Sequence, residues 1–154
     1  MKVIVSACLL GRNCKYNGSN NKNASLIDVL AAHPEVAIVP VCPEVAGGLP
    51  TPRPPAEIVG GEVMTVDGVS VDAEFRLGCR RIIEQLEGAL GAGEISGAVL
   101  QSRSPSCGVD QVYDGTFSGT LVDGRGLFAQ ALLERGVPIC DVSDLETCAQ
   151  LFDS

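Results

Sequence analysis

Four short apolar runs constrain the fold of this chain most strongly: residues 2–7, 36–41, 97–100 and 137–142. None of them alternates apolar with polar residues, as a strand with one face in water would. Continuous apolar runs are typical of strands buried on both faces of a parallel sheet. Segments with apolar residues at intervals of three and four lie between and after these runs, and they predict helices over residues 24–32, 72–90, 127–134 and 144–152.

Two further segments are predicted to form small hairpins. Residues 57–71 contain the turn signals Gly60-Gly61 and Asp67-Gly68, and residues 111–121 are expected to turn at Asp114-Gly115. The elements together predict an α/β fold with a mostly parallel sheet of about four strands, helices on both faces and small hairpin excursions. We expect residues 1–154 to form a single domain, because no repeat or interdomain linker interrupts them.

The charge and the apolar pattern limit what the chain can bind. Asp and Glu number 19 against 11 Lys and Arg, a formal net charge of −8, and this balance argues against nucleic acid as a partner. No stretch approaches the roughly 18 apolar residues that a membrane span needs, and the apolar start is too short for a signal peptide. We therefore expect a cytoplasmic protein that does not bind membranes.

The seven cysteines fall into two groups. An odd number suits a reducing compartment better than a disulfide framework. Three of them lie on predicted helix stripes or in a buried strand, and we interpret them as small core hydrophobes: Cys79, Cys140 and Cys148. Four others lie in segments rich in Gly, Pro and Ser, where a thiol has no evident packing role: Cys8, Cys14, Cys42 and Cys107.

The second group is expected to converge in space. Cys8 and Cys42 each end a predicted strand, and Cys107 follows another strand after a short loop. The carboxyl ends of parallel strands meet at one edge of a sheet, where ligands bind in open α/β folds. Convergent thiols predict a metal or iron–sulfur site. The spacing is not that of a zinc ribbon, because no CxxC pair is present.

Other polar residues near these thiols have two interpretations each. Glu44 either caps its loop or acts as a general acid or base beside the thiols. The serines at positions 102, 104 and 106 are either turn residues or groups that orient a substrate. Four basic residues are either solvated or form an electropositive pocket: Arg12, Lys15, Arg53 and Arg103. His33, the single histidine, lies at a predicted helix end and suggests no catalytic triad.

At these residues the sequence resembles the thiouracil desulfidase family. The segments that carry the resemblance are Ser6-Ala7-Cys8-Leu9-Leu10-Gly11, Cys14-Lys15-Tyr16-Asn17-Gly18, Cys42-Pro43-Glu44, Gly47-Gly48-Leu49-Pro50-Thr51-Pro52-Arg53-Pro54-Pro55, Glu57-Ile58 and Ser104-Pro105-Ser106-Cys107-Gly108. Tyr113-Asp114-Gly115-Thr116-Phe117 and Gly124-Arg125-Gly126 agree more loosely. The resemblance extends over nearly the whole chain. Asn17 and Gln101 depart from it, because the family usually has Asp and often Lys there.

The resemblance implies a [4Fe–4S] cluster held by Cys8, Cys42 and Cys107, with one iron left open to the sulfur of a thiolated nucleobase. It implies that Glu44 and Ser104 take part in the reaction, the removal of sulfur as hydrosulfide from a base such as 2- or 4-thiouracil. Whether Cys14 binds the cluster or lies behind a ligand stays open. So do two other functions: a zinc- or cluster-binding module that docks on a partner protein, and an enzyme that inserts sulfur rather than removing it.

Overall fold

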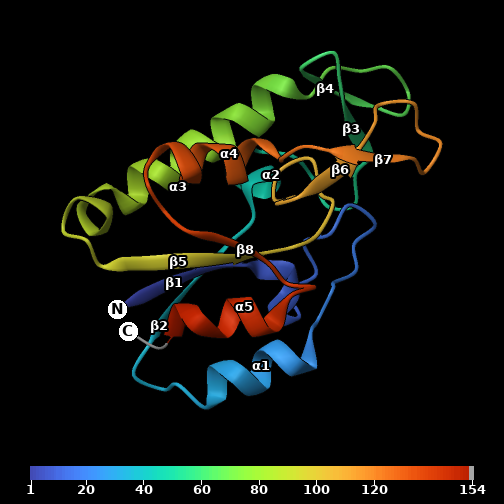
Figure 1. Ribbon diagram of the computed structural model, residues 1–154. Coiled ribbons are helices and arrows are strands. Elements are labelled where there is room, and N and C mark those ends of the chain that lie inside the picture. Colours follow the sequence, from blue (N-terminus) through green and yellow to red (C-terminus); the bar gives the residue numbers. More distant parts are fainter. Residues whose placement is uncertain (153–154) are drawn as a thin grey trace.

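A parallel four-stranded sheet forms the centre of the protein, which a computed structural model describes over residues 1–152 (Figure 1). Its strands are β1 (Lys2–Ser6), β2 (Ala37–Val41), β5 (Ile95–Leu100) and β8 (Ile139–Asp141), in the order β2-β1-β5-β8. Every neighbouring pair runs parallel. The predicted α/β class and the number of sheet strands are confirmed, and all carboxyl ends of these strands lie at one edge.

Helices cover both faces of the sheet, as predicted (Figure 1). On one face lie α3 (Asp72–Gly91) and α4 (Leu127–Glu134), whose Ile82 and Phe128 share a core with Ile4. On the other lie α1 (Ala24–Ala31), α5 (Leu145–Ala149) and the short 3₁₀ helix η2 (Gln150–Phe152), which pack on Val3 and Val5. Successive residues of β1 therefore serve opposite cores, and this explains why its sequence is apolar throughout.

Both predicted hairpins are present, but the second turns elsewhere. In the first, β3 (Ala56–Val59) and β4 (Glu62–Thr65) join through Gly60 and Gly61, whose φ angles are +57° and +84°. In the second, β6 (Gln111–Tyr113) pairs with β7 (Leu121–Asp123) and leaves residues 114–120 as a loop. The Asp114 side chain accepts a hydrogen bond from Thr116 N at 2.9 Å. This local turn replaces the tight strand-to-strand connection expected there.

Two short helices occupy segments predicted as loops. The 3₁₀ helix η1 (Ala7–Leu10) follows β1 directly and ends at Gly11, where φ is +94°. The helix α2 (Pro43–Ala46) follows β2, with Pro43 in its first turn. Proline is favoured there because its φ is already helical and no N–H is required. Cys8 therefore lies within a helical turn, and Cys42 is the residue that precedes α2.

The three cysteines interpreted as core residues are all buried, but two of them are not free thiols. Cys140 and Cys148 form a disulfide with a Cα–Cα distance of 5.5 Å. The prediction of two independent core thiols is wrong because Asp144 caps α5 and turns the chain back along β8. Its side chain accepts from Thr147 N at 3.2 Å. Cys79 remains a buried free thiol.

None of the helices within residues 1–152 is long and apolar enough to cross a lipid bilayer.

Candidate functional site

A cavity of about 570 Å³ opens where β1, β2 and β5 end. Residues that follow each of these strands line it, so chain segments far apart in sequence contribute to one wall. All four loop cysteines lie in this wall, together with both predicted catalytic residues: Cys8, Cys14, Cys42, Cys107, Glu44 and Ser104. The strand order places these side chains together, as the carboxyl-edge argument requires.

The protein encloses the thiol of Cys107 and partly buries that of Cys8. Cys107 is 4% exposed, and its burial raises the pKa of the thiol far above the ordinary value. Burial also raises the pKa of Cys8, and the neighbouring Cys42 adds to that shift. The Asn21 amide donates to Cys8 Sγ at 3.7 Å. Such thiols give up a proton only when a positive charge, such as a metal, compensates for it.

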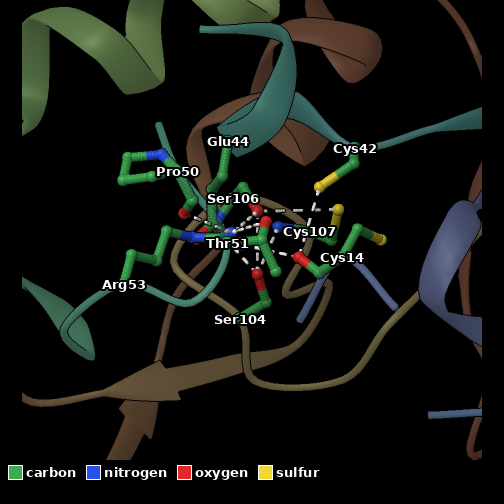
Figure 2. A network of polar contacts seen from close by, with 9 residues as sticks. All are labelled: Cys14, Cys42, Glu44, Pro50, Thr51, Arg53, Ser104, Ser106 and Cys107. Atoms are coloured by element: carbon green, nitrogen blue, oxygen red, sulfur yellow. Dashed lines mark hydrogen bonds and ion pairs between the residues drawn. The ribbon is translucent and has the colours of Figure 1, made fainter. Parts of the chain in front are cut away.

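Cys14 and Cys42 form a hydrogen-bonded pair. The interaction with the neighbouring Cys14 thiol lowers the pKa of Cys42 to about 7, and the same interaction raises the pKa of Cys14. Cys42 Sγ also lies 3.9 Å from the carbonyl oxygen of Cys14 (Figure 2). Cys42 is therefore the free cysteine of the cavity that ionises most readily.

A chain of hydrogen bonds joins Ser104 to Glu44 (Figure 2). Ser106 Oγ donates to Glu44 Oε2 at 2.9 Å, and Ser104 Oγ lies 2.9 Å from Ser106 Oγ. Ser104 Oγ also accepts from the backbone N–H groups of Ser106 and Cys107, each at 3.1 Å. A hydroxyl has one proton, and that of Ser106 is directed to Glu44, so Ser104 must donate to Ser106. Both hydrogen bonds therefore point toward the carboxylate: Ser104 donates to Ser106, and Ser106 donates to Glu44.

Arg53 holds the other side of Glu44. Its Nε donates to Glu44 Oε1 at 3.0 Å, and its Nη2 donates to the carbonyl of Cys14 at 2.8 Å (Figure 2). Nη1 donates to Pro50 O at 3.3 Å and to Thr51 Oγ1 at 3.1 Å. One guanidinium thus fixes the carboxylate and ties together the segments that carry Cys14 and the proline-rich loop.

Two glycines determine where α2, and with it Glu44, can lie. A Cβ built on Gly78 of α3 would be 1.7 Å from the carbonyl oxygen of Pro43. A Cβ built on Gly47 would be 1.9 Å from the carbonyl oxygen of Glu74. Only glycine permits this approach of the two helix backbones. The pair Gly47-Gly48 was evident in the sequence as a loop signal, whereas its contact with Gly78 was not.

The remaining wall of the cavity is both basic and aromatic. Three of the four basic residues considered above line it, namely Lys15, Arg53 and Arg103, whereas Arg12 lies in the wall of a separate hollow. The cavity wall also includes Tyr16, Tyr113, Phe117 and Gln101. Ser102 lies in the same wall but is hydrogen-bonded to Asp141 rather than to Glu44. The sequence interpretation did not assign a role to the aromatic residues.

The cavity brings together side chains that bind soft metals. Cys8, Cys42 and Cys107 all line it. Soft thiolates are the ligands of iron–sulfur clusters, in which each sulfur binds a different iron. The arrangement is compatible with such a cluster.

Comparison with known protein families matches residues 3–144 of the chain to the model of 2-thiouracil desulfurase. The chain belongs to the 2-thiouracil desulfurase family. A relative from Bacillus subtilis (strain 168), described as uncharacterized protein YbbK, is 35% identical in an alignment of 158 positions, gaps included. The alignment covers 93% of this chain and 97% of the relative. The resemblance identified from the cysteine motifs is confirmed.

A solved structure of the same fold is also similar. It is that of the [4Fe–4S]-dependent thiouracil desulfidase TudS, with a TM-score of 0.85 and 39% sequence identity. The match covers 99% of this chain and 97% of TudS. The 2-thiouracil desulfurase family relationship thus extends over the whole sheet and both hairpins.

Proposed function

We propose that this protein is a [4Fe–4S]-dependent desulfidase that removes sulfur, as hydrosulfide, from a thiolated pyrimidine base such as 2- or 4-thiouracil. The observation that carries this proposal is the shared cavity, in which three thiols from three strand ends face the Ser104–Ser106–Glu44 chain. Membership of the 2-thiouracil desulfurase family and the likeness to TudS support it.

In this proposal Cys8, Cys42 and Cys107 hold the cluster. Each comes from a different segment that follows a sheet strand, and each lines the cavity. Cys14 lies beside Cys42 as a hydrogen-bond donor, which favours a supporting position rather than a place among the ligands. When bound, the cluster supplies a thiophilic, Lewis-acidic iron that polarises the carbon–sulfur bond of the substrate.

The protein's own groups handle the protons. Replacing sulfur by oxygen at the ring carbon requires the attacking water molecule to lose both protons: one leaves with the sulfur as hydrosulfide, and the other goes to a base. Glu44 is the base, because its carboxylate is held by Arg53 and reached from the cavity through the two serine hydroxyls. Ser104 lies at the cavity end of this chain, and its hydroxyl can take a proton from the water when one of the two backbone N–H groups that it accepts gives way to the water. A positioned acid or base of this kind typically contributes about 10²–10⁴-fold to a rate.

The charge of the protein favours a small substrate. The net charge of −8 opposes binding to a polyanion, whereas a free base carries no phosphate. Lys15 and Arg103 in the cavity wall suit the carbonyl oxygens of a pyrimidine. We also propose a role in sulfur metabolism and a cytoplasmic location. The cysteines of the cavity are free thiols, unlike the Cys140–Cys148 pair, and a reducing compartment keeps such thiols free to bind iron.

Anaerobic reconstitution with iron and sulfide tests the proposal. The reconstituted protein should contain about four irons per chain and release sulfide and uracil from 2-thiouracil. Replacing Cys8, Cys42 or Cys107 by Ser should abolish the cluster absorption, whereas Cys79→Ala, at a free thiol outside the cavity, should retain it. Tight binding of one zinc without iron, and no sulfide release, would favour a non-enzymatic module instead.

A further inference from the structure

The two hairpins meet beside the cavity through a contact that the proposed reaction does not use. Gly115, in the loop between β6 and β7, packs so closely on β3 that a Cβ there would lie 2.7 Å from the carbonyl oxygen of Ile58. Both hairpins lie beyond the carboxyl edge of the sheet (Figure 1). The contact joins two sequence motifs that lie almost 60 residues apart, Glu57-Ile58 and residues 113–117.

Glu57 anchors the loop. Its Oε1 atom accepts hydrogen bonds from Gly115 N at 3.0 Å and from Phe117 N at 3.2 Å. Two backbone N–H groups from one loop thus converge on a single carboxylate oxygen, which is a strong, charge-assisted arrangement. Without such a partner, a seven-residue connection like residues 114–120 has many conformations open to it.

Phe117 adopts a backbone conformation that needs this anchor. Its φ angle is +56°, in the left-handed region that an aromatic residue rarely occupies. Among residues 1–152, Phe117 and Arg103 are the only non-glycine residues with a positive φ, and both line the cavity. Strain of this kind persists where surrounding contacts fix it, and it gathers at ligand-binding sites.

Packing does not account for Phe117. The other three phenylalanines of the chain are all buried: Phe128 and Phe152 in the cores that cover the sheet, and Phe75 on α3. Phe117 belongs to neither core cluster and is only partly exposed, because it lies in the cavity wall. Tyr113 and Tyr16 line the same cavity. An aromatic residue held at the mouth of a site that contains reactive groups is well suited to contact a planar ring.

We propose that Phe117 stacks on the pyrimidine ring of the substrate and that Glu57 is the positioning residue that holds it there. This inference rests on the proposed function and deepens it, because a stacking residue would give the site a preference for flat heterocycles over other compounds with a carbon–sulfur double bond. Stacking on an aromatic side chain requires only the flat face of the base and does not depend on its pattern of hydrogen-bonding groups. In this proposal residues 114–120 determine which substrates bind, and the residues that follow the sheet strands carry out the reaction.

The test compares two thiocarbonyl substrates that differ in planarity. 2-Thiouracil is flat, whereas 5,6-dihydro-2-thiouracil keeps the same sulfur, oxygen and N–H groups on a puckered ring. The wild-type holoenzyme should prefer the flat substrate in kcat/KM. Phe117→Ala should raise KM for 2-thiouracil by about tenfold or more, the effect of losing one base–aromatic stack, and should abolish most of the preference. Phe117→Tyr should restore both.

Glu57→Ala should reproduce the KM effect of Phe117→Ala, with a smaller change in kcat. Glu57→Gln should retain much of the wild-type behaviour, because an amide oxygen can still accept both N–H groups. Glu62→Ala in β4 and Val122→Ala in β7 are matched controls, since both residues are exposed on the same hairpins and lie outside the cavity wall. Neither control should change the preference by more than about twofold.

Binding of uracil, measured by ligand-observed NMR on the holoprotein, separates this inference from the proposed reaction. Weaker uracil binding in Phe117→Ala and Glu57→Ala supports the inference even if no sulfide is released, a result that would reject the desulfidase proposal alone. Unchanged uracil affinity in both variants overturns it. So does an unchanged preference between the two substrates in an active Phe117→Ala enzyme.

Discussion

Arg53 and Glu44 form the most enclosed ion pair within residues 1–152. Their Nε and Oε1 atoms lie 3.0 Å apart, and the two side chains are only 5% and 16% exposed. Every other ion pair in that part of the chain has at least one partner more than a third exposed. Arg53 links Glu44, the proposed base, to the carbonyl oxygen of Cys14, so the same side chain contributes to the stability of the protein and to its chemistry.

We expect Arg53→Ala to destabilise the protein by about 3 kcal/mol, because it leaves a poorly hydrated carboxylate without its partner. Arg53→Lys keeps the charge but loses the planar fork that reaches Cys14 O, Pro50 O and Thr51 Oγ1, and it should cost about half as much. Urea unfolding of the apoprotein measures both effects. Arg135→Ala, which breaks the exposed pair with Glu87, is the control and should cost less than about 1 kcal/mol.

Two glycines of the same helix should respond to alanine in opposite ways. Gly78→Ala should destabilise the protein by about 2 kcal/mol, since the added methyl would overlap the Pro43 carbonyl and push α2 away from α3. Gly88→Ala meets no atom within 4 Å and should stabilise α3 by about 0.5–1 kcal/mol. Thermal unfolding of both variants measures the difference. If Gly78→Ala were as stable as Gly88→Ala, close packing would not determine the position of Glu44.

The strands were predictable because burial on both faces requires an uninterrupted run of apolar residues. Val3, Ile4 and Val5 must all be apolar when successive residues serve opposite cores. The turn of the first hairpin was predictable for a different reason: Gly60 and Gly61 both have a positive φ, which glycine adopts readily. The second turn was misplaced because Asp114 satisfies its own loop and Glu57 holds that loop from another hairpin. A contact across 58 residues leaves no local pattern.

The part of the site that is built from residues just after the sheet strands was predictable from the sequence. Cys42 follows β2 directly and Cys8 lies two residues after the end of β1, so the parallel sheet brings them together. The order of the hydrogen bonds could not be predicted, because Ser104 and Ser106 have the composition of an ordinary turn. Their link to Glu44 depends on where α2 lies, and that depends on Gly78 in another helix. The Cys140–Cys148 disulfide was missed because it needs the reversal of the chain at Asp144.

Ser106 should matter to the reaction although it lies behind the residues nearest the cavity. It is 2% exposed and provides the only serine hydroxyl that bonds directly to Glu44 within the described residues. Ser106→Ala should lower kcat by about 100-fold, because the route from Ser104 to the carboxylate is interrupted. Iron content should be unchanged. Ser106→Thr, which keeps a hydroxyl, should recover part of the rate.

The control for this prediction is Ser118→Ala, at an exposed serine whose hydroxyl contacts only other residues of its own loop. It should leave kcat within about twofold of wild type. A Ser106→Ala enzyme with normal kcat would show that protons reach Glu44 by another route.

In the cluster-free protein, alkylation should distinguish the free cysteines in a defined order. The pKa of Cys42 is about 7, because the Cys14 thiol donates to it, whereas burial raises the pKa of Cys79 to about 12. Only the thiolate reacts with iodoacetamide, so modification of Cys42 should accelerate as the pH rises through about 7 and level off above it. Cys79 and Cys107, both buried with raised pKa, should remain unmodified over that range.

Peptide mass spectrometry after brief labelling measures the modification of each cysteine. Cys14→Ala removes the donor and should move the midpoint for Cys42 to higher pH, toward that of an ordinary thiol. A midpoint that did not move, or labelling of Cys107 before Cys42, would contradict the proposed Cys14–Cys42 hydrogen bond.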